Sequence, residues 1–114
     1  MLSDTLHRQL LDNLTTAVLL LDQQLCIAYL NPAAEMLLAV SGQRVQQQPV
    51  ESLLSDSQQA SLPFQRALKT AQSFTKREAR LNLSNGQQLM VDYTVTPVID
   101  PRGSWILVEV YPRD

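Results

Sequence analysis

The chain has 114 residues, of which 45% are hydrophobic and 18% are charged, and its formal net charge is -2 at pH 7. A chain of this length and composition forms one domain with a buried core and needs no disulfide or metal to hold it together. Its 9 basic and 11 acidic residues lack the positive excess typical of nucleic-acid-binding domains. Every uninterrupted apolar run is far shorter than the ~18 residues of a membrane span. We therefore expect neither a nucleic-acid nor a membrane partner.

The glycine, cysteine and histidine positions exclude several kinds of site. Gly42, Gly86 and Gly103 stand alone, so no Gly-rich phosphate loop can be formed. Cys26 is the single cysteine and His7 the single histidine, which excludes a disulfide framework and a Cys/His zinc site within one chain. We expect Cys26 to be packed in a strand, His7 to lie on the surface, and no metal or cofactor to be bound. A lone thiol agrees with a reducing, cytoplasmic location.

Residues 1–14 are predicted to form an amphipathic helix. Leu6, Leu10 and Leu14 recur at intervals of four residues, a spacing that places them on one helix face. Ser3 or Asp4 is expected to cap the first turn. The leucine face needs a partner surface.

Two apolar runs follow, at residues 17–21 and 25–30, separated by a polar turn that begins at Asp22. They predict two adjacent antiparallel strands, buried on both faces. Asn31 and Pro32 then predict the start of a helix, because the asparagine side chain accepts hydrogen bonds from free N–H groups and a proline at the first position sacrifices none. We treat Asp22, Asn31 and Pro32 as structural residues.

The helix that starts at Pro32 is expected to end at Gly42, followed by a short helix over residues 50–54 and another that begins near Pro63. The side chains of the first of these helices that are expected to face the core are Met36, Leu37, Leu38 and Val40.

From residue 74 the hydrophobic period changes to two, which predicts three antiparallel strands. Turn sequences at residues 84–86 and 100–103 separate them. A bulge at Gly86, rather than a two-residue turn, is the preferred register for the first hairpin. The expected cross-strand pairs are Leu81 with Leu89, Ala79 with Val91, Tyr93 with Val110 and Val95 with Val108.

One face of these strands is a continuous apolar layer that the short helices must cover. The other face is also too apolar to stay exposed in a monomer. Its cover is the chain's own first helix, the same surface of a second chain, or both. We expect a homodimer, and the candidate dimer-interface residues are Leu6, Leu10, Leu14, Trp105 and Leu107.

Three aromatic residues, Tyr29, Phe64 and Tyr93, are candidates for the lining of a small ligand pocket, although the bulky aliphatic side chains around them favour a filled core. Glu78 and Asp92 come opposite one another in the preferred register. We expect them to be solvated charges rather than an acid/base or metal-binding pair. Because no inward-facing carboxylate or histidine is expected, a small α+β enzyme is the least favoured interpretation.

The order of elements and the sequence itself resemble the PAS domain family. The similarity lies in residues 19–22 and 27–35, where Asp22 closes the first strand and Asn31 opens a helix through Asn-Pro-Ala-Ala. The resemblance implies an α+β PAS fold with a five-stranded antiparallel sheet in the order 2-1-5-4-3, short helices on one face, and the N-terminal amphipathic helix. The PAS domain would span residues 15–112, with residues 113–114 beginning a connector.

Together with residues 71–75 and 106–114, the same segment resembles the N-terminal sensory domain of nitrogen-regulation sensor histidine kinases. This implies a regulatory and dimerisation domain of a cytoplasmic two-component kinase that controls nitrogen assimilation, with no catalytic residue in these 114 residues. A response regulator and a PII-type protein are implied as partners of the full-length kinase only. The alternative function is a small-metabolite-binding PAS sensor. The chain departs from many PAS domains in ending with Pro112-Arg113-Asp114 instead of Asp-x-Thr.

Overall fold

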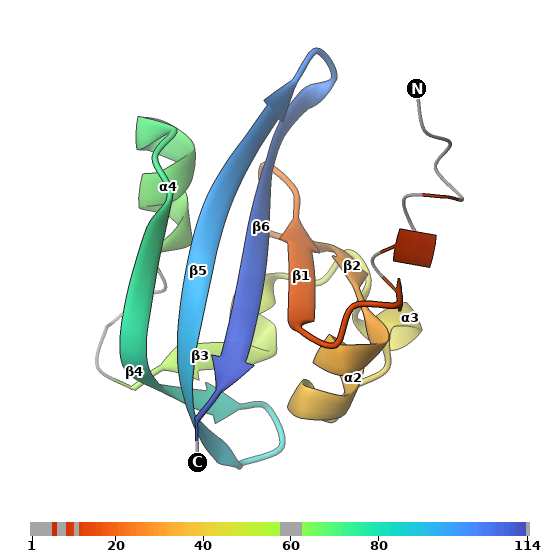
Figure 1. Ribbon diagram of the computed structural model, residues 1–114, viewed down its shortest axis with the longest axis vertical. Helices are drawn as coiled ribbons and strands as arrows, with labels where there is room; N and C mark the ends of the chain where they lie inside the picture. Colours follow the sequence, from red (N-terminus) through yellow and green to blue (C-terminus); the bar gives the residue numbers. More distant parts are fainter. Residues whose placement is uncertain (1–5, 7–8, 11, 58–62, 114) are drawn as a thin grey trace.

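An antiparallel sheet of six strands, in the order β2-β1-β6-β5-β4-β3, forms the framework of the computed structural model (Figure 1). The structure describes residues 6, 9–10, 12–57 and 63–113. The strands are β1 (Ala17–Leu21), β2 (Ile27–Leu30), β3 (Leu54–Asp56), β4 (Phe74–Leu83), β5 (Gln88–Asp100) and β6 (Gly103–Pro112). The helices are α2 (Pro32–Leu38), α3 (Gly42–Val45), the 3-10 helix η1 (Val50–Ser52) and α4 (Phe64–Thr70).

The sheet has one strand more than the five that the sequence predicts. Residues 50–54 were expected to form a helix, but the helical part ends at Ser52 and Leu54 begins β3, where it pairs with Leu83. β3 therefore lies outside β4 at the edge of the sheet, and the order of the other five strands is the predicted one.

The helices pack against one face of the sheet. α2 contacts β1 and β2, and α4 contacts β5 and β6. In Figure 1 the opposite face is seen, with β5 and β6 in front of the segment that carries η1 and β3. Side chains of β5 point alternately to the two faces of the sheet. Val91, Tyr93 and Val95, which are at most 2% exposed, face the helices.

The predicted registers of both hairpins are confirmed. Ala79 pairs with Val91 and Leu81 with Leu89. Val95 pairs with Val108 across the second hairpin. The first hairpin contains one irregularity that the sequence does not predict, a bulge between Lys76 and Ala79.

Asn31 caps α2 as predicted, and Pro32 occupies the first turn. The expected end of this helix at Gly42 is wrong. The helix ends at Leu38 because Ala39 adopts a left-handed conformation, with φ +56°, and Ser41 instead precedes α3. The shorter helix also leaves Met36 84% exposed, so its expected place in the core is wrong.

The N-terminal segment is described in part. Leu6, Gln9, Leu10 and Asp12 have helical backbone, whereas Asn13 and Leu14 do not, so the helix does not extend to residue 14 as predicted. The expected caps at Ser3 and Asp4, and His7, lie outside the described residues.

Candidate functional site

The sheet face that the helices do not cover carries rows of apolar side chains across neighbouring strands. One row is formed by Tyr29, Leu20 and Leu107, which pair successively across β2, β1 and β6. Beside it, Trp105 on β6 pairs with Val98 on β5. Tyr29, Leu20, Leu107 and Trp105 are partly buried and Val98 is exposed. The structure thus brings the two predicted sheet residues, Leu107 and Trp105, onto one surface.

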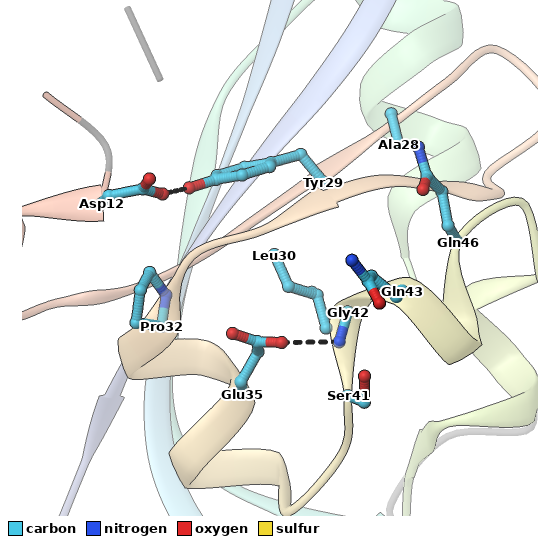
Figure 2. Close-up of a pocket in the computed structure, with 10 residues that line it drawn as sticks. All are labelled: Asp12, Ala28, Tyr29, Leu30, Pro32, Glu35, Ser41, Gly42, Gln43 and Gln46. Atoms are coloured by element: carbon cyan, nitrogen blue, oxygen red, sulfur yellow. Dashed lines mark hydrogen bonds between the residues drawn. The ribbon is translucent and has the colours of Figure 1, made fainter. Parts of the chain in front are cut away.

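The three predicted leucines of the N-terminal segment are exposed to solvent. The exposed fractions of Leu6, Leu10 and Leu14 are 38%, 55% and 47%. The segment is tethered to the sheet because the Tyr29 hydroxyl donates a hydrogen bond to Asp12 (Figure 2). Since Tyr29 belongs to the apolar row, this hydrogen bond connects the N-terminal segment at Asp12 to the uncovered sheet face.

A surface pocket of about 430 Å³ lies next to this tether (Figure 2). Two internal contacts line it. One is the Tyr29–Asp12 hydrogen bond, and in the other the Gly42 N–H donates to Glu35 Oε2 over 2.6 Å. The pocket opens to solvent between β2 and α2. Its polar groups at Tyr29, Asp12, Glu35 and Gly42 are engaged in hydrogen bonds within the protein.

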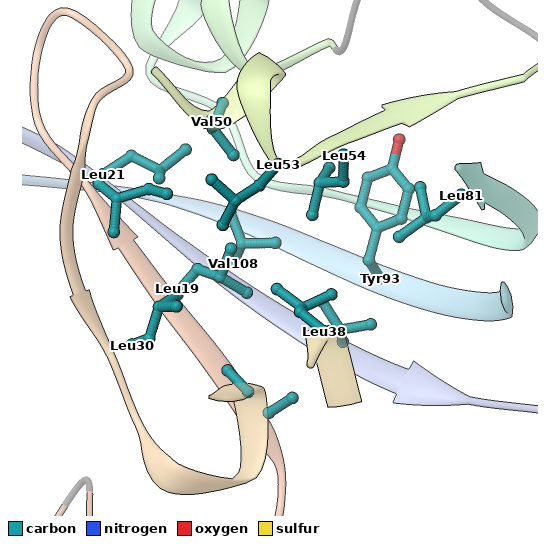
Figure 3. Packing of buried hydrophobic residues seen from close by; sticks show 14 of the residues in the cluster. Leu19, Leu21, Leu30, Leu38, Val50, Leu53, Leu54, Leu81, Tyr93 and Val108 are labelled. Atoms are coloured by element: carbon teal, nitrogen blue, oxygen red, sulfur yellow. The ribbon is translucent and has the colours of Figure 1, made fainter. Parts of the chain in front are cut away.

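The predicted ligand-pocket residues are divided between two places. Phe64 and Tyr93 meet in the core as an edge-to-face pair, with ring centroids 6.2 Å apart, whereas Tyr29 lies in the surface pocket. The cavity beside Phe64 and Tyr93 measures about 10 Å³. Such a volume is near the minimum for one water molecule. Figure 3 shows why: Leu54 and Leu81 fill the space around the Tyr93 ring.

A buried carboxylate lies at the end of this core, where the sequence predicts none. Asp56 on β3 has a side-chain exposure of 0% and forms an ion pair with Lys76, which is 19% exposed. Burial raises the pKa of the Tyr93 hydroxyl above its ordinary value of 10.0, and the negative charge of Asp56 raises it further. The expectation of a core without inward carboxylates is therefore wrong. The cation of Lys76 neutralises this carboxylate, so the pair is not arranged as a free general base.

Glu78 and Asp92 are in contact, but the contact is made by the Glu78 backbone in the β4 bulge and not by two facing carboxylates. The Glu78 backbone N–H donates to Asp92 Oδ1 over 2.9 Å, and Glu78 has φ +56°. Asp92 also forms an ion pair with Arg113 at 2.9 Å. The pKa of Asp92 is lowered from 3.8, first by the Glu78 hydrogen bond and further by Arg113, with desolvation opposing the shift.

The described residues hold no group of three or more His, Cys, Asp or Glu side chains that could bind a metal ion. Cys26 is partly buried beside the β1–β2 turn, with its Sγ 3.9 Å from the Gln24 carbonyl oxygen. Asp22 shapes that turn, because its Oδ1 accepts the N–H groups of Gln24 and Cys26, each over 2.9 Å. Among the helices of the described residues, none is long and apolar enough to cross a membrane.

The curled antiparallel sheet, with short helices on one face, defines a class of sensory and regulatory domains. The PAS fold family model matches residues 5–110, and the chain belongs to this family. The PAS domain of nitrogen regulation protein NR(II) from Vibrio parahaemolyticus superposes with a TM-score of 0.79 and 33% identity, covering 95% of this chain and 98% of that one. A PAS domain from a two-component sensor histidine kinase, at 16% identity and TM-score 0.76, shares the fold.

Among curated proteins, the chain is similar to the sensory histidine kinase/phosphatase NtrB. It is 32% identical to NtrB of Vibrio alginolyticus over 110 residues, which cover 96% of this chain and 31% of that protein. With NtrB of Escherichia coli O157:H7 it is 35% identical over 106 residues, or 93% of this chain and 29% of that protein. The chain thus spans about a third of the length of these relatives, and it is homologous to their PAS domain.

Proposed function

We propose that this domain dimerises and relays a conformational signal within a cytoplasmic two-component sensor histidine kinase that regulates nitrogen assimilation. Its homology to NtrB supports the kinase context. The observation that carries the proposal is the set of exposed leucines, Leu6, Leu10 and Leu14, in an N-terminal segment that the Asp12–Tyr29 hydrogen bond joins to an apolar sheet face. If two copies of the chain pack these surfaces against each other, the apolar side chains of both are removed from water, which favours the dimer.

The relay would work through geometry rather than chemistry. A dimer formed by the exposed leucines and the outer face of β6 would fix the relative orientation of two sheets. Any change in that orientation would then alter how the segments beyond β6 are presented to a kinase region. A ligand that binds one orientation better would shift the population between the two.

The proposal is tested by charging the surface at two places. Leu10→Asp and Trp105→Asp place a carboxylate in the proposed interface, and both should convert a dimer to a monomer in light scattering behind size exclusion. Ile99→Asp is the matched control, because Ile99 is 65% exposed and belongs to the other face of the β5–β6 hairpin. Circular dichroism should show all three variants folded. Folded variants that keep the dimer mass would overturn the proposal.

The metabolite-sensor alternative makes a different prediction for the unmodified protein. Since the core cavity holds about 10 Å³, a metabolite would bind in a surface pocket, such as the one at Tyr29 and Glu35. Native mass spectrometry reports both stoichiometry and bound mass. A clean dimer supports the relay domain, and a reproducible additional small-molecule mass supports the sensor.

A further inference from the structure

Arg113, the residue directly after β6, is fixed to the sheet by both its backbone and its side chain. Its N–H donates to the Met90 carbonyl over 2.8 Å. Its Nη1 lies 3.0 Å and 2.9 Å from the two carboxylate oxygens of Asp92, and its Nη2 lies 3.8 Å from Glu78 Oε1. Arginine holds a carboxylate with directional, charge-assisted hydrogen bonds. The chain therefore leaves β6 in a defined direction, beside β4 and β5 (Figure 1).

The same carboxylate also holds the bulge of β4. Glu78 has φ +56°, a conformation that is unfavourable for a residue with a side chain. Its N–H points at Asp92 Oδ1, the oxygen that also accepts from Arg113. Asp92 thus stabilises a strained position in one strand and the departing end of another. The Glu78 N–H and the Arg113 guanidinium donate to the same carboxylate oxygen. A change at one donor therefore changes the position of the Asp92 carboxylate and the strength of its hydrogen bond to the other donor.

The bulge is in turn connected to the core. Lys76, two residues before Glu78, turns inward to the buried Asp56, and β4 shifts its register directly after it. A short physical path therefore leads from the buried ion pair, through the bulge and Asp92, to the exit of the chain. The side chains of Asp92 and Arg113 are 26% and 42% exposed, so the last link is weak enough to open and close.

We propose that Asp92 is a positioning residue that couples the β4 bulge to the segment leaving β6. In the proposed relay function, on which its signalling role rests, it supplies the contact that holds the chain where it leaves β6. Opening of the bulge withdraws the Glu78 N–H, shifts the Asp92 carboxylate and loosens Arg113. Release of Arg113 has the reciprocal effect on Glu78, as coupling between two sites requires.

Amide hydrogen exchange measured by NMR on the 114-residue protein tests this coupling. Arg113→Gln keeps the backbone donor but removes the charge. It should speed exchange at the Glu78 amide about two- to fivefold, the range expected for a well-oriented surface ion pair. Asp92→Asn should speed exchange at both Glu78 and Arg113. Arg102→Gln is the matched control, because Arg102 forms no ion pair among the described residues, and it should change neither amide.

Glu78→Gly completes the test from the other end. Glycine adopts φ near +56° without strain, but it also removes the Glu78 carboxylate that lies 3.8 Å from Arg113 Nη2. Glu78→Gln, which removes only that charge, is therefore the reference, and exchange at Arg113 should be slower in Glu78→Gly than in Glu78→Gln if the bulge and the exit are coupled. If Arg113→Gln leaves the Glu78 amide at the rate of the Arg102→Gln control, the coupling is absent and the proposal fails. Light scattering on the same samples shows whether the protein is a dimer or a monomer. A monomer in which Glu78 and Arg113 remain coupled would overturn the proposed function but not this inference.

Discussion

Asn31 and Val18 are joined by two hydrogen bonds. The Asn31 N–H donates to the Val18 carbonyl over 3.1 Å, and Asn31 Oδ1 accepts from the Val18 N–H over 2.9 Å. The same Oδ1 accepts the Ala34 N–H within α2, and Nδ2 donates to the Thr16 carbonyl over 2.8 Å. Asn31 is fully buried. One side chain thus caps a helix and fixes that helix to the beginning of β1.

Asn31→Ala is expected to lower the free energy of unfolding by about 3 kcal/mol, more than the loss of an ordinary helix cap, because it also leaves buried backbone groups without partners. Urea denaturation followed by circular dichroism measures the change. Ser41→Ala is the matched control, since Ser41 precedes α3 but makes no side-chain cap hydrogen bond. Equal effects of the two substitutions would contradict the role given to Asn31.

Tyr93→Phe is expected to leave stability at pH 7 unchanged or to raise it by up to about 1 kcal/mol. The Tyr93 side chain is buried, and its hydroxyl lies near the Asp56 carboxylate without meeting the geometry of a full hydrogen bond. Removing an unsatisfied buried hydroxyl relieves a desolvation cost while the ring contact with Phe64 is kept. Thermal or urea unfolding measures this. Phe64→Leu is a useful comparison, because it removes the ring contact and should destabilise. A clear loss of stability in Tyr93→Phe would show that the hydroxyl makes a favourable interaction.

The loss of folding stability at low pH should depend on Asp92. Its pKa in the folded protein is below the ordinary 3.8, chiefly because it accepts the Glu78 N–H. The unfolded chain therefore takes up the proton first as the pH falls. The stabilisation is fully present above about pH 4 and is lost as the pH falls through the lower folded-state pKa.

Urea unfolding between pH 2 and pH 5 checks this expectation. The rise in stability with pH over this interval should be smaller in Asp92→Asn than in the unmodified protein. Glu51→Gln is the control, because none of the described residues donates a hydrogen bond to Glu51, and it should keep the original slope. An unchanged slope in Asp92→Asn would contradict a folded-state preference for the charged carboxylate.

The sequence predicts the two hairpin registers because strong alternation of apolar residues and recognisable turns act together there. A one-residue slip would turn Val91 and Val95 out of the core. β3 escapes prediction because Leu54-Ser55-Asp56 is too short to show a period. The end of α2 and the β4 bulge escape it for another reason: Ala39 and Glu78 adopt positive φ without glycine, and tertiary contacts impose those conformations.

The candidate site was predictable to a similar degree. The leucine spacing and the two-sided apolar strands predict a surface that requires a partner; the structure shows Leu10 exposed and Trp105 partly buried beside Val98, and the interface itself stays a prediction. The Asp56–Lys76 pair was not predictable, because the partners come from a strand that the sequence does not reveal and from the residue just before a bulge. The Arg113 contacts depend on the same bulge.

The bulge at Glu78 also bears on how this domain avoids uncontrolled assembly. β3 pairs with β4 only at Leu81, Asn82 and Leu83, so the first half of β4 has no further strand beside it among the described residues. A regular strand at that position would be a template for adding the strand of another molecule. The bulge breaks the ladder there, and Arg77, Glu78 and Arg80 place charges along it. Edge-to-edge addition of a further strand along the first half of β4 is thereby disfavoured.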